Sequence, residues 1–279
     1  MLSHFPKPHK ELDLLDEGAI RSAMDPIEAM QLQGLEVCLE IDSTNQRLLD
    51  YARKGLQGPL GCLAEYQTAG RGRRGNIWQS PPSSGLCLSL LRTFDQDPKS
   101  MVGLSLAVGT TVAKVLEECG VPKVGLKWPN DLYWAGRKLG GLLIDVLGQP
   151  DGPTRCVIGI GINVCIPSGT VLPIDQPSTD LAATHWKPLP RNHLAAALLS
   201  GLLRTAHQFE AEGLSPFLES WQRRDVLMKQ SLTVQLPNGQ VMEGIGAGIH
   251  SDGTLRIQSG QEILYLTAGE ITVRMTKGV

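Results

Sequence analysis

The sequence lacks any apolar run near the ~20 residues that a membrane-spanning helix needs. Its first residues, Met-Leu-Ser-His-Phe-Pro-Lys, also lack the charged-then-apolar order of a secretory signal peptide. We therefore expect a cytoplasmic protein without a membrane anchor.

Neither sign of charge dominates, because the sequence has 26 Lys and Arg residues and 28 Asp and Glu residues, which gives a formal net charge of -2. A whole-protein field that attracts nucleic acid or an anionic membrane is therefore missing. The six cysteines form no Cys-x-x-Cys pair, and the six histidines show no ligand spacing. These absences argue against a disulfide framework and a zinc site, and we assign no metal ion to protein side chains.

Hydrophobic periodicity divides the chain into three segments. Residues 1–35 hold three prolines around a weakly periodic stretch and are predicted to be a partly ordered leader. Residues 36–228 mix strand-like runs with helical stripes, the clearest helices lying from Ser100 to Gly120 and over 191–212. Short turns between strand-like runs favour an antiparallel or mixed sheet flanked by helices, an α+β fold. Residues 229–279 change to period-2 alternation and predict a small all-β domain.

Residues 70–75, Gly-Arg-Gly-Arg-Arg-Gly, place three guanidinium groups on a backbone that glycine allows to turn tightly. We call residues 70–85 the arginine loop. It formally matches a dinucleotide-binding fingerprint, but that fingerprint needs a helix at the glycines, which Pro81 and Pro82 prevent. No Gly-Lys-Ser/Thr follows, which excludes a Walker loop. An RNA-binding Arg/Gly segment and a solvated surface loop stay open at this point.

Other segments carry groups that suit a nucleotide pocket. Trp78 offers an indole that can stack on a base. Residues 127–131, Lys-Trp-Pro-Asn-Asp, put a cation, an amide and a carboxylate at a tight turn, and residues 137–141 add cations beside two glycines. Asn163 ends an apolar run. Each feature alone is commonplace in a turn or a core, but together with the arginine loop they predict one nucleotide pocket.

Six ordered motifs resemble those of bacterial biotin–protein ligases: Asp42-Ser43-Thr44-Asn45, Glu65-Tyr66-Gln67, residues 70–75 with Trp78, Lys127-Trp128-Pro129-Asn130-Asp131, Arg137-Lys138-Leu139-Gly140-Gly141 and Gly159-Ile160-Gly161-Ile162-Asn163. The resemblance extends through Gly269-Glu270-Ile271. It implies a biotin/lipoyl ligase-like catalytic domain over 36–228 and a C-terminal SH3-like β-barrel over 229–279. The implied activity is ATP-dependent formation of biotinyl-5′-AMP, followed by transfer of biotin to a lysine of a biotin carboxyl carrier protein.

The resemblance also implies which residues bind biotin and ATP: Ser43, Thr44, Asn45, Gln67, Gly70, Arg71, Gly72, Arg73, Arg74, Trp78, Lys127, Asn130, Lys138, Gly141 and Asn163. The first four would line the biotin site, and Trp78, Asn130 and Asn163 would hold the adenine. Arg71 and Arg73 would hold carboxylate and phosphate.

The implied catalytic residues are Lys138, Arg73 and Asp131. Lys138 would bridge the biotin carboxyl group and the α-phosphate, and Asp131 would act on the acceptor lysine as a base or an orienting group. Mg²⁺ should accompany ATP, coordinated chiefly by phosphates and water.

Two alternatives remain, a lipoate or octanoate ligase or transferase of related fold and a nucleic-acid-binding module, which the balanced charge disfavours. Only about 40 residues precede Asp42, fewer than the roughly 60 that a winged-helix repressor domain needs. We therefore expect no specific DNA binding. An exposed sheet edge could pair two subunits into a homodimer.

Overall fold

The computed structural model describes residues 14–149, 151–170, 176–184, 190–236, 239–267 and 272–275. Its α-helices are α1 (Glu17–Ala23), α2 (Pro26–Gln31), α3 (Thr44–Arg53), α4 (Leu104–Glu118), α5 (Arg191–Glu212) and α6 (Leu218–Gln222). The strands are β1 (Gly34–Ile41), β2 (Leu60–Gln67), β3 (Gly85–Phe94), β4 (Gly125–Lys127), β5 (Asp131–Trp134), β6 (Arg137–Leu147), β7 (Thr154–Asn163), β8 (Ser231–Gln235), β9 (Val241–Ile249), β10 (Leu255–Ser259), β11 (Glu262–Leu266) and β12 (Thr272–Met275).

Seven strands form one mixed sheet in the order β1-β2-β3-β7-β6-β5-β4. β1 and β2 run parallel, and every other neighbouring pair is antiparallel. The short turns between β4, β5, β6 and β7 allow this arrangement, because a parallel pair would need a long crossover. The predicted α+β class with a mixed sheet is confirmed.

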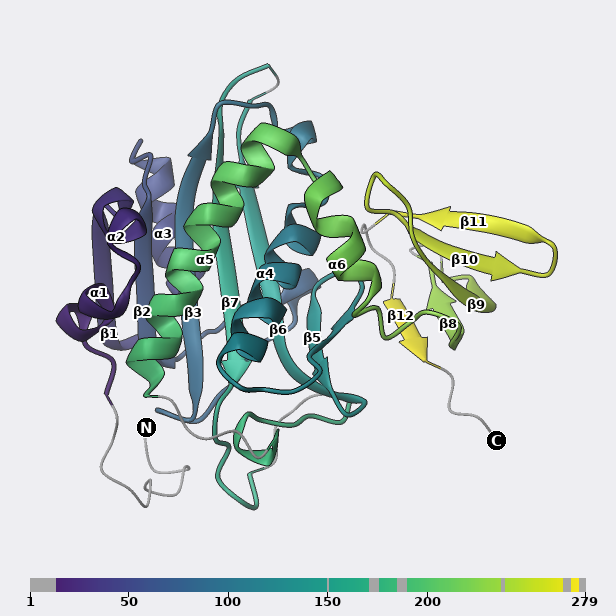
Figure 1. The fold of residues 1–279 in the computed structure, drawn as a ribbon, viewed down its shortest axis with the longest axis horizontal. Coiled ribbons are helices and arrows are strands. Elements are labelled where there is room, and N and C mark those ends of the chain that lie inside the picture. The colour runs from purple at the N-terminus through teal and green to yellow at the C-terminus, as the bar shows by residue number, and fades with distance from the viewer. Residues whose placement is uncertain are drawn as a thin grey trace.

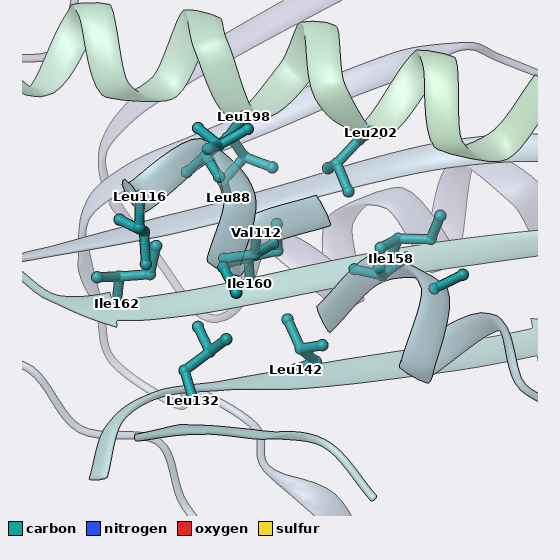
Figure 2. Close-up of a cluster of buried hydrophobic side chains, with 14 of the residues drawn as sticks. Leu88, Val112, Leu116, Leu132, Leu142, Ile158, Ile160, Ile162, Leu198 and Leu202 are labelled. Carbon is teal, nitrogen blue, oxygen red and sulfur yellow. The ribbon is translucent and has the colours of Figure 1, made fainter. Parts of the chain in front are cut away.

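Helices α4 and α5 cover one face of the sheet (Figure 1). Figure 2 shows their apolar side chains meeting those of the strands, including Val112 and Leu198 from the helices and Leu88, Ile158 and Ile160 from β3 and β7. Because alternate residues of a strand point to opposite faces, the other face of β3 and β7 presents Leu91 and Val157, which pack with α3, and the small or polar residues Cys87, Ser89, Gly159 and Gly161. That face carries α3 at one end and leaves room for a cavity at the other.

Helix α4 and the turn before it, Pro98–Glu118, form the one described helical stretch long and apolar enough to cross a membrane, and 61% of its apolar window is buried inside the protein. Its apolar stripe belongs to the main core. The α-helix begins at Leu104 rather than Ser100, because Pro98–Met101 forms a 3-10 turn and Gly103 adopts φ 87°. Helix α5 spans residues 191–212, as predicted.

The N-terminal segment is more ordered than a leader. Helix α1 is capped by the Asp16 side chain, which accepts a hydrogen bond from the Ala19 amide. Ile20, Met24 and Leu32 are buried in the same core as α4 and α5. Strand β1, which starts at Gly34, was not predicted. The described part of segment 1–35 therefore packs into the same core as the seven-stranded sheet, and the expected boundary at residue 36 falls inside β1.

A second sheet lies at the end of the molecule opposite α1 and α2 (Figure 1). Its five antiparallel strands follow the order β11-β10-β9-β8-β12. Strands β8, β10 and β12 match predicted runs, whereas β9 and β11 were not singled out. The sheet is consistent with the expected SH3-like domain. The Gly269-Glu270-Ile271 motif lies outside the described residues.

Candidate active site

A cavity of about 690 Å³ lies against β3, β6 and β7 and is bounded by the start of α3 and the arginine loop. Nearly all predicted site residues line it: Ser43, Thr44, Asn45, Gln67, Arg71, Gly72, Arg73, Arg74, Trp78, Lys127, Asn130, Asp131, Lys138, Gly141 and Asn163. Gly70 is the predicted residue that does not. The fold therefore brings together motifs that are up to 120 residues apart in sequence.

The arginine loop folds back on itself as a narrow hairpin. The Trp78 amide donates to the Gly70 carbonyl over 2.9 Å, and the Gly72 amide donates to the Asn76 carbonyl over 2.7 Å. A single 3-10 turn, Arg73–Gly75, closes the tip, so no α-helix begins at the glycines. A Cβ atom at Gly70 would lie 2.3 Å from the Trp78 carbonyl oxygen. Gly70 therefore allows the close approach of the two loop strands, and its predicted contact with a ligand stays a prediction.

The polar end of the cavity is built from a chain of hydrogen bonds. Gln67 Oε1 accepts from the Thr44 amide over 2.8 Å, and the Ser89 hydroxyl donates to Asn45 Oδ1 over 2.5 Å. Gly159 makes room for this amide, since a Cβ atom there would lie 2.1 Å from Asn45 Oδ1. Ser43 caps α3 by accepting from the Gln46 amide.

The indole of Trp78 lies against β7. A Cβ atom at Gly161 would approach its Cε2 atom to 2.5 Å, so the ring can occupy this position only because residue 161 is glycine. Lys138 Nζ lies 6.0 Å from the ring centroid, within cation–π range. Trp78 thus contacts β7 and lies near a cationic side chain.

Several cations meet at the cavity, each with a defined partner. Lys138 Nζ lies 2.7 Å from Asp131 Oδ1, and Arg73 donates to Asn130 Oδ1 over 3.3 Å. Lys127 is buried and donates to the Tyr133 hydroxyl over 3.3 Å. Burial lowers the pKa of Lys127 from its ordinary value, although the Asp131 charge acts in the opposite direction. Burial, and then the nearby Arg74 charge, lowers the pKa of Arg73.

Residues 38–163 match the Biotin/lipoate A/B protein ligase family. The chain is 38% identical over 269 residues to the Bifunctional ligase/repressor BirA of Salmonella typhimurium, covering 96% of this chain and 80% of that protein. The chain belongs to the biotin protein ligase family. It is an enzyme of the ligase class, and its recognition from the six motifs is confirmed.

Two further relatives extend the match. The Biotin--[acetyl-CoA-carboxylase] ligase of Mycobacterium tuberculosis is 33% identical over 266 residues, covering 92% of this chain and 95% of that protein. The solved biotin protein ligase from Aquifex aeolicus, in complex with biotin and ATP, shares the fold with a TM-score of 0.74 and 26% identity. The similarity covers 88% of this chain and all of the Aquifex chain.

Two polar side chains of the ligase motifs are engaged by the protein itself. Asn163 lines the cavity, but its Nδ2 donates to the Thr179 carbonyl over 2.9 Å. Glu65, from the Glu65-Tyr66-Gln67 motif, forms a buried bidentate ion pair with Arg191 at the start of α5. Glu65 is therefore structural, whereas its neighbour Gln67 lines the cavity.

Sequence reasoning missed several residues of the site. Tyr133 and Gln176 line the cavity and are joined by a 2.7 Å hydrogen bond, and β12 contributes Arg274 to the lining. Ser89 contacts two predicted residues, Thr44 and Asn45. Its signal was available, since it is a hydroxyl inside the apolar run of residues 86–91. Gln176 and Arg274 carry no comparable signal, because only the fold brings them to the cavity.

Proposed function

We propose that this ligase condenses biotin and ATP into biotinyl-5′-adenylate and then transfers the biotinyl group to a lysine of a biotin carboxyl carrier protein. The observation that carries the proposal is the convergence of Arg71, Arg73, Lys127 and Lys138 on one cavity that the uncharged polar residues Thr44, Asn45 and Gln67 also line. A carboxylate and a triphosphate repel each other, so joining them requires fixed cations. The relatives' names and the Aquifex complex support the same substrates.

We assign the two substrates to different groups of residues that line the cavity. The uncharged hydrogen-bonding groups of Thr44, Asn45 and Gln67 suit the neutral ring system of biotin. Trp78, packed on Gly161, offers an indole face for adenine. Arg71 and Arg73 lie between the two groups along the chain and line the same space. This arrangement supports a binding mode in which the biotin carboxylate and the α-phosphate lie beside the cations.

In the first step a carboxylate oxygen of biotin attacks the α-phosphorus of ATP, and the bond to the β-phosphate breaks to release pyrophosphate. Lys138 supplies a positive charge at the shared oxygens, where negative charge accumulates. Its ammonium is held 2.7 Å from Asp131 Oδ1, which fixes its position before substrates arrive. Arg73, held by Asn130, adds a second fixed charge.

In the second step the acceptor lysine attacks the acyl carbon, the bond to the phosphate oxygen breaks, and AMP leaves. A lysine with a pKa of about 10.4 is mostly protonated at neutral pH and must lose a proton. Among the described residues that line the cavity, Asp131 alone carries a carboxylate. We assign this group to orient or deprotonate the amine. Mg²⁺ bound with ATP would be coordinated chiefly by phosphate oxygens and water, because Mg²⁺ usually keeps several water ligands. We also assign the enzyme to the cytoplasm, where ATP and carrier proteins occur.

Mass spectrometry tests the proposal directly. The protein is incubated with ATP, Mg²⁺ and either biotin or lipoate, and the acyl-adenylate formed is identified. We expect biotinyl-adenylate, and we expect Lys138→Ala to lower its formation by at least about 100-fold, as loss of a preorganised charge does. Lys114→Ala is the matched control, because Lys114 is an exposed residue of α4. Lipoyl-adenylate as the main product, or a normal rate with Lys138→Ala, would contradict the proposal.

A further inference from the structure

Asp145 of β6 lies outside the cavity lining but holds two residues that line it. Its carboxylate accepts hydrogen bonds from Arg71 Nη1 and Nη2, both over 3.1 Å. The same carboxylate accepts from Asn45 Nδ2 over 2.9 Å. We propose that Asp145 is a positioning residue that latches the arginine loop onto the sheet and orders the biotin-carboxylate end of the site. The proposal rests on the proposed function and adds a residue to it.

The Arg71–Asp145 pair has the geometry of a latch. Two parallel N–H···O bonds between planar groups fix orientation as well as distance, which a single-point contact with a lysine does not. The pair joins a loop residue to a strand residue 74 positions later in the sequence. The side chains of Arg71 and Asp145 are 37% and 20% exposed, so water screens this pair less than a fully exposed one.

Asp145 also sets the orientation of Asn45. A carboxylate only accepts hydrogen bonds, so the amide must turn its Nδ2 toward Asp145 and its Oδ1 toward the Ser89 hydroxyl. The Leu143 carbonyl accepts from the same Nδ2 over 3.2 Å and reinforces the choice. Asp145 thereby decides that an acceptor, rather than a donor, faces Ser89 in the polar end of the cavity.

Charge balance explains why an acidic residue suits this position. The arginine loop carries Arg71, Arg73 and Arg74 within four residues, and their mutual repulsion opposes a compact loop. Asp145 offsets one of the three charges from outside the cavity. A guanidinium has five N–H groups and the latch uses two of them, so Arg71 keeps donors for a substrate carboxylate.

Steady-state kinetics of Asp145→Asn test the assignment. We expect the KM for biotin to rise by about tenfold, the size expected when a charge-assisted hydrogen bond is lost, with a smaller change in the KM for ATP. Trypsin should also cut the arginine loop of the substrate-free variant faster. Asp145→Glu keeps the charge and should recover part of the loss. Glu210→Gln is the matched control, because it removes a similarly half-buried ion pair, with Arg92, remote from the cavity lining.

A double-mutant comparison separates positioning from general destabilisation. Because Asp145 acts through Asn45 as well as through Arg71, Asp145→Asn should raise the KM for biotin by a smaller factor in an Arg71→Ala background than in the wild-type protein. Full additivity of the two substitutions would overturn the proposal. So would a KM for biotin of Asp145→Asn that equals that of Glu210→Gln. A KM for biotin below that of the wild-type protein would also overturn it and would show that Asp145 competes with the substrate carboxylate. If Asp145→Asn does not fold, the same comparison is made with Asp145→Glu. A wild-type protein that forms no biotinyl-adenylate contradicts the proposed function, whereas faster cutting of Asp145→Asn still reports the latch.

Discussion

Gly159 and Gly161 stand two residues apart on β7 and therefore face the same side of the sheet, toward the cavity. Each position requires glycine because a different side chain packs against it. A Cβ atom at 159 would collide with the amide of Asn45, and one at 161 would collide with the indole of Trp78. In the proposed function, Gly159 therefore adjoins a biotin-binding residue and Gly161 an adenine-binding residue.

Alanine at each of these positions should weaken the binding of one substrate and leave that of the other nearly unchanged. We expect Gly159→Ala to raise the KM for biotin by about tenfold and Gly161→Ala to raise the KM for ATP by about tenfold, each corresponding to ~1.4 kcal/mol. The KM of the other substrate should stay within about twofold in each variant. Steady-state kinetics of both variants make each the control for the other. Equal effects on both substrates would contradict the division of the cavity.

For individual residues, the sequence predicted which polar side chains line the cavity, because the ordered motifs identify them without coordinates. It could not predict the local partners of those residues. The close approach of Gly70 to the Trp78 backbone, for example, is visible only in the structure. Asp145 was invisible for a related reason, since a lone carboxylate in the strand 137–147 resembles any solvent-facing residue until Arg71 is placed beside it.

The arginine loop is the element whose state should depend on substrates. Residues 71, 73 and 74 each offer trypsin a cleavage site, and Asp145, Asn130 and Gly161 hold the loop to the sheet. Bound biotin and ATP would add contacts between the loop arginines and the substrate anions. The loop would then cover the adenylate and exclude water from the mixed anhydride.

We therefore expect biotin plus ATP to slow tryptic cleavage in the loop by at least about tenfold, as closure of a loop over its ligand does. Timed digestion followed by mass spectrometry of the fragments measures the effect. Cleavage after Lys123, an exposed residue with positive φ, provides the internal control and should not change. Equal protection at both sites would indicate global stabilisation rather than loop closure.

The ion pair between Glu65 and Arg191 ties β2 to the first turn of α5. Both side chains are nearly inaccessible, at 4% and 6% exposure, and Glu65 also accepts from the Leu15 amide. Removing one partner of such a pair leaves a buried charge without compensation. We expect Glu65→Gln to lower the free energy of unfolding by about 3 to 5 kcal/mol.

Urea unfolding measures this loss. Asp25→Asn is the control, since it removes the pair of Asp25 with Arg204, whose side chains are more than half exposed, and should cost at most about 1 kcal/mol. Similar losses in the two variants would show that the Glu65 pair does not depend on its burial.

Element boundaries show where local sequence information ends. Helix α5 matches its prediction because a long apolar stripe dominates its sequence. Strand β1 was missed although Leu35, Val37, Leu39 and Ile41 alternate with polar or small residues, because the weak segment before it suggested a leader. That segment is ordered through contact with α5, and no local pattern reports a contact between residues so far apart.

At the scale of the whole molecule, the C-terminal sheet and the catalytic domain share one hydrophobic core. Leu232, Ile257 and Val273 belong to the same buried cluster as the residues of α4 and α5. Trp128, from the turn before β5, donates through Nε1 to the Gly253 carbonyl over 3.0 Å. Strand β12 also lines the cavity. The change of periodicity near residue 229 marks a change of architecture, and these contacts join the two parts across it.

A continuous apolar interface couples the unfolding of the parts that it joins. We therefore expect a single calorimetric transition, with a calorimetric to van't Hoff enthalpy ratio of about one. All five tryptophans precede residue 222, but Trp128 contacts the Gly253 carbonyl, so their fluorescence mixes signals from the two parts. Hydrogen exchange of peptides from α4 and β9 therefore measures the opening of each part separately. Trp128→Phe leaves the Gly253 carbonyl without the indole donor. We expect this variant to lower the midpoint temperature of the single transition by several degrees, at roughly 2 to 4 °C per kcal/mol, and to keep one transition. Two resolved transitions, with β9 exchanging before α4, would mean that the domains unfold independently and that the cavity loses its β12 wall first.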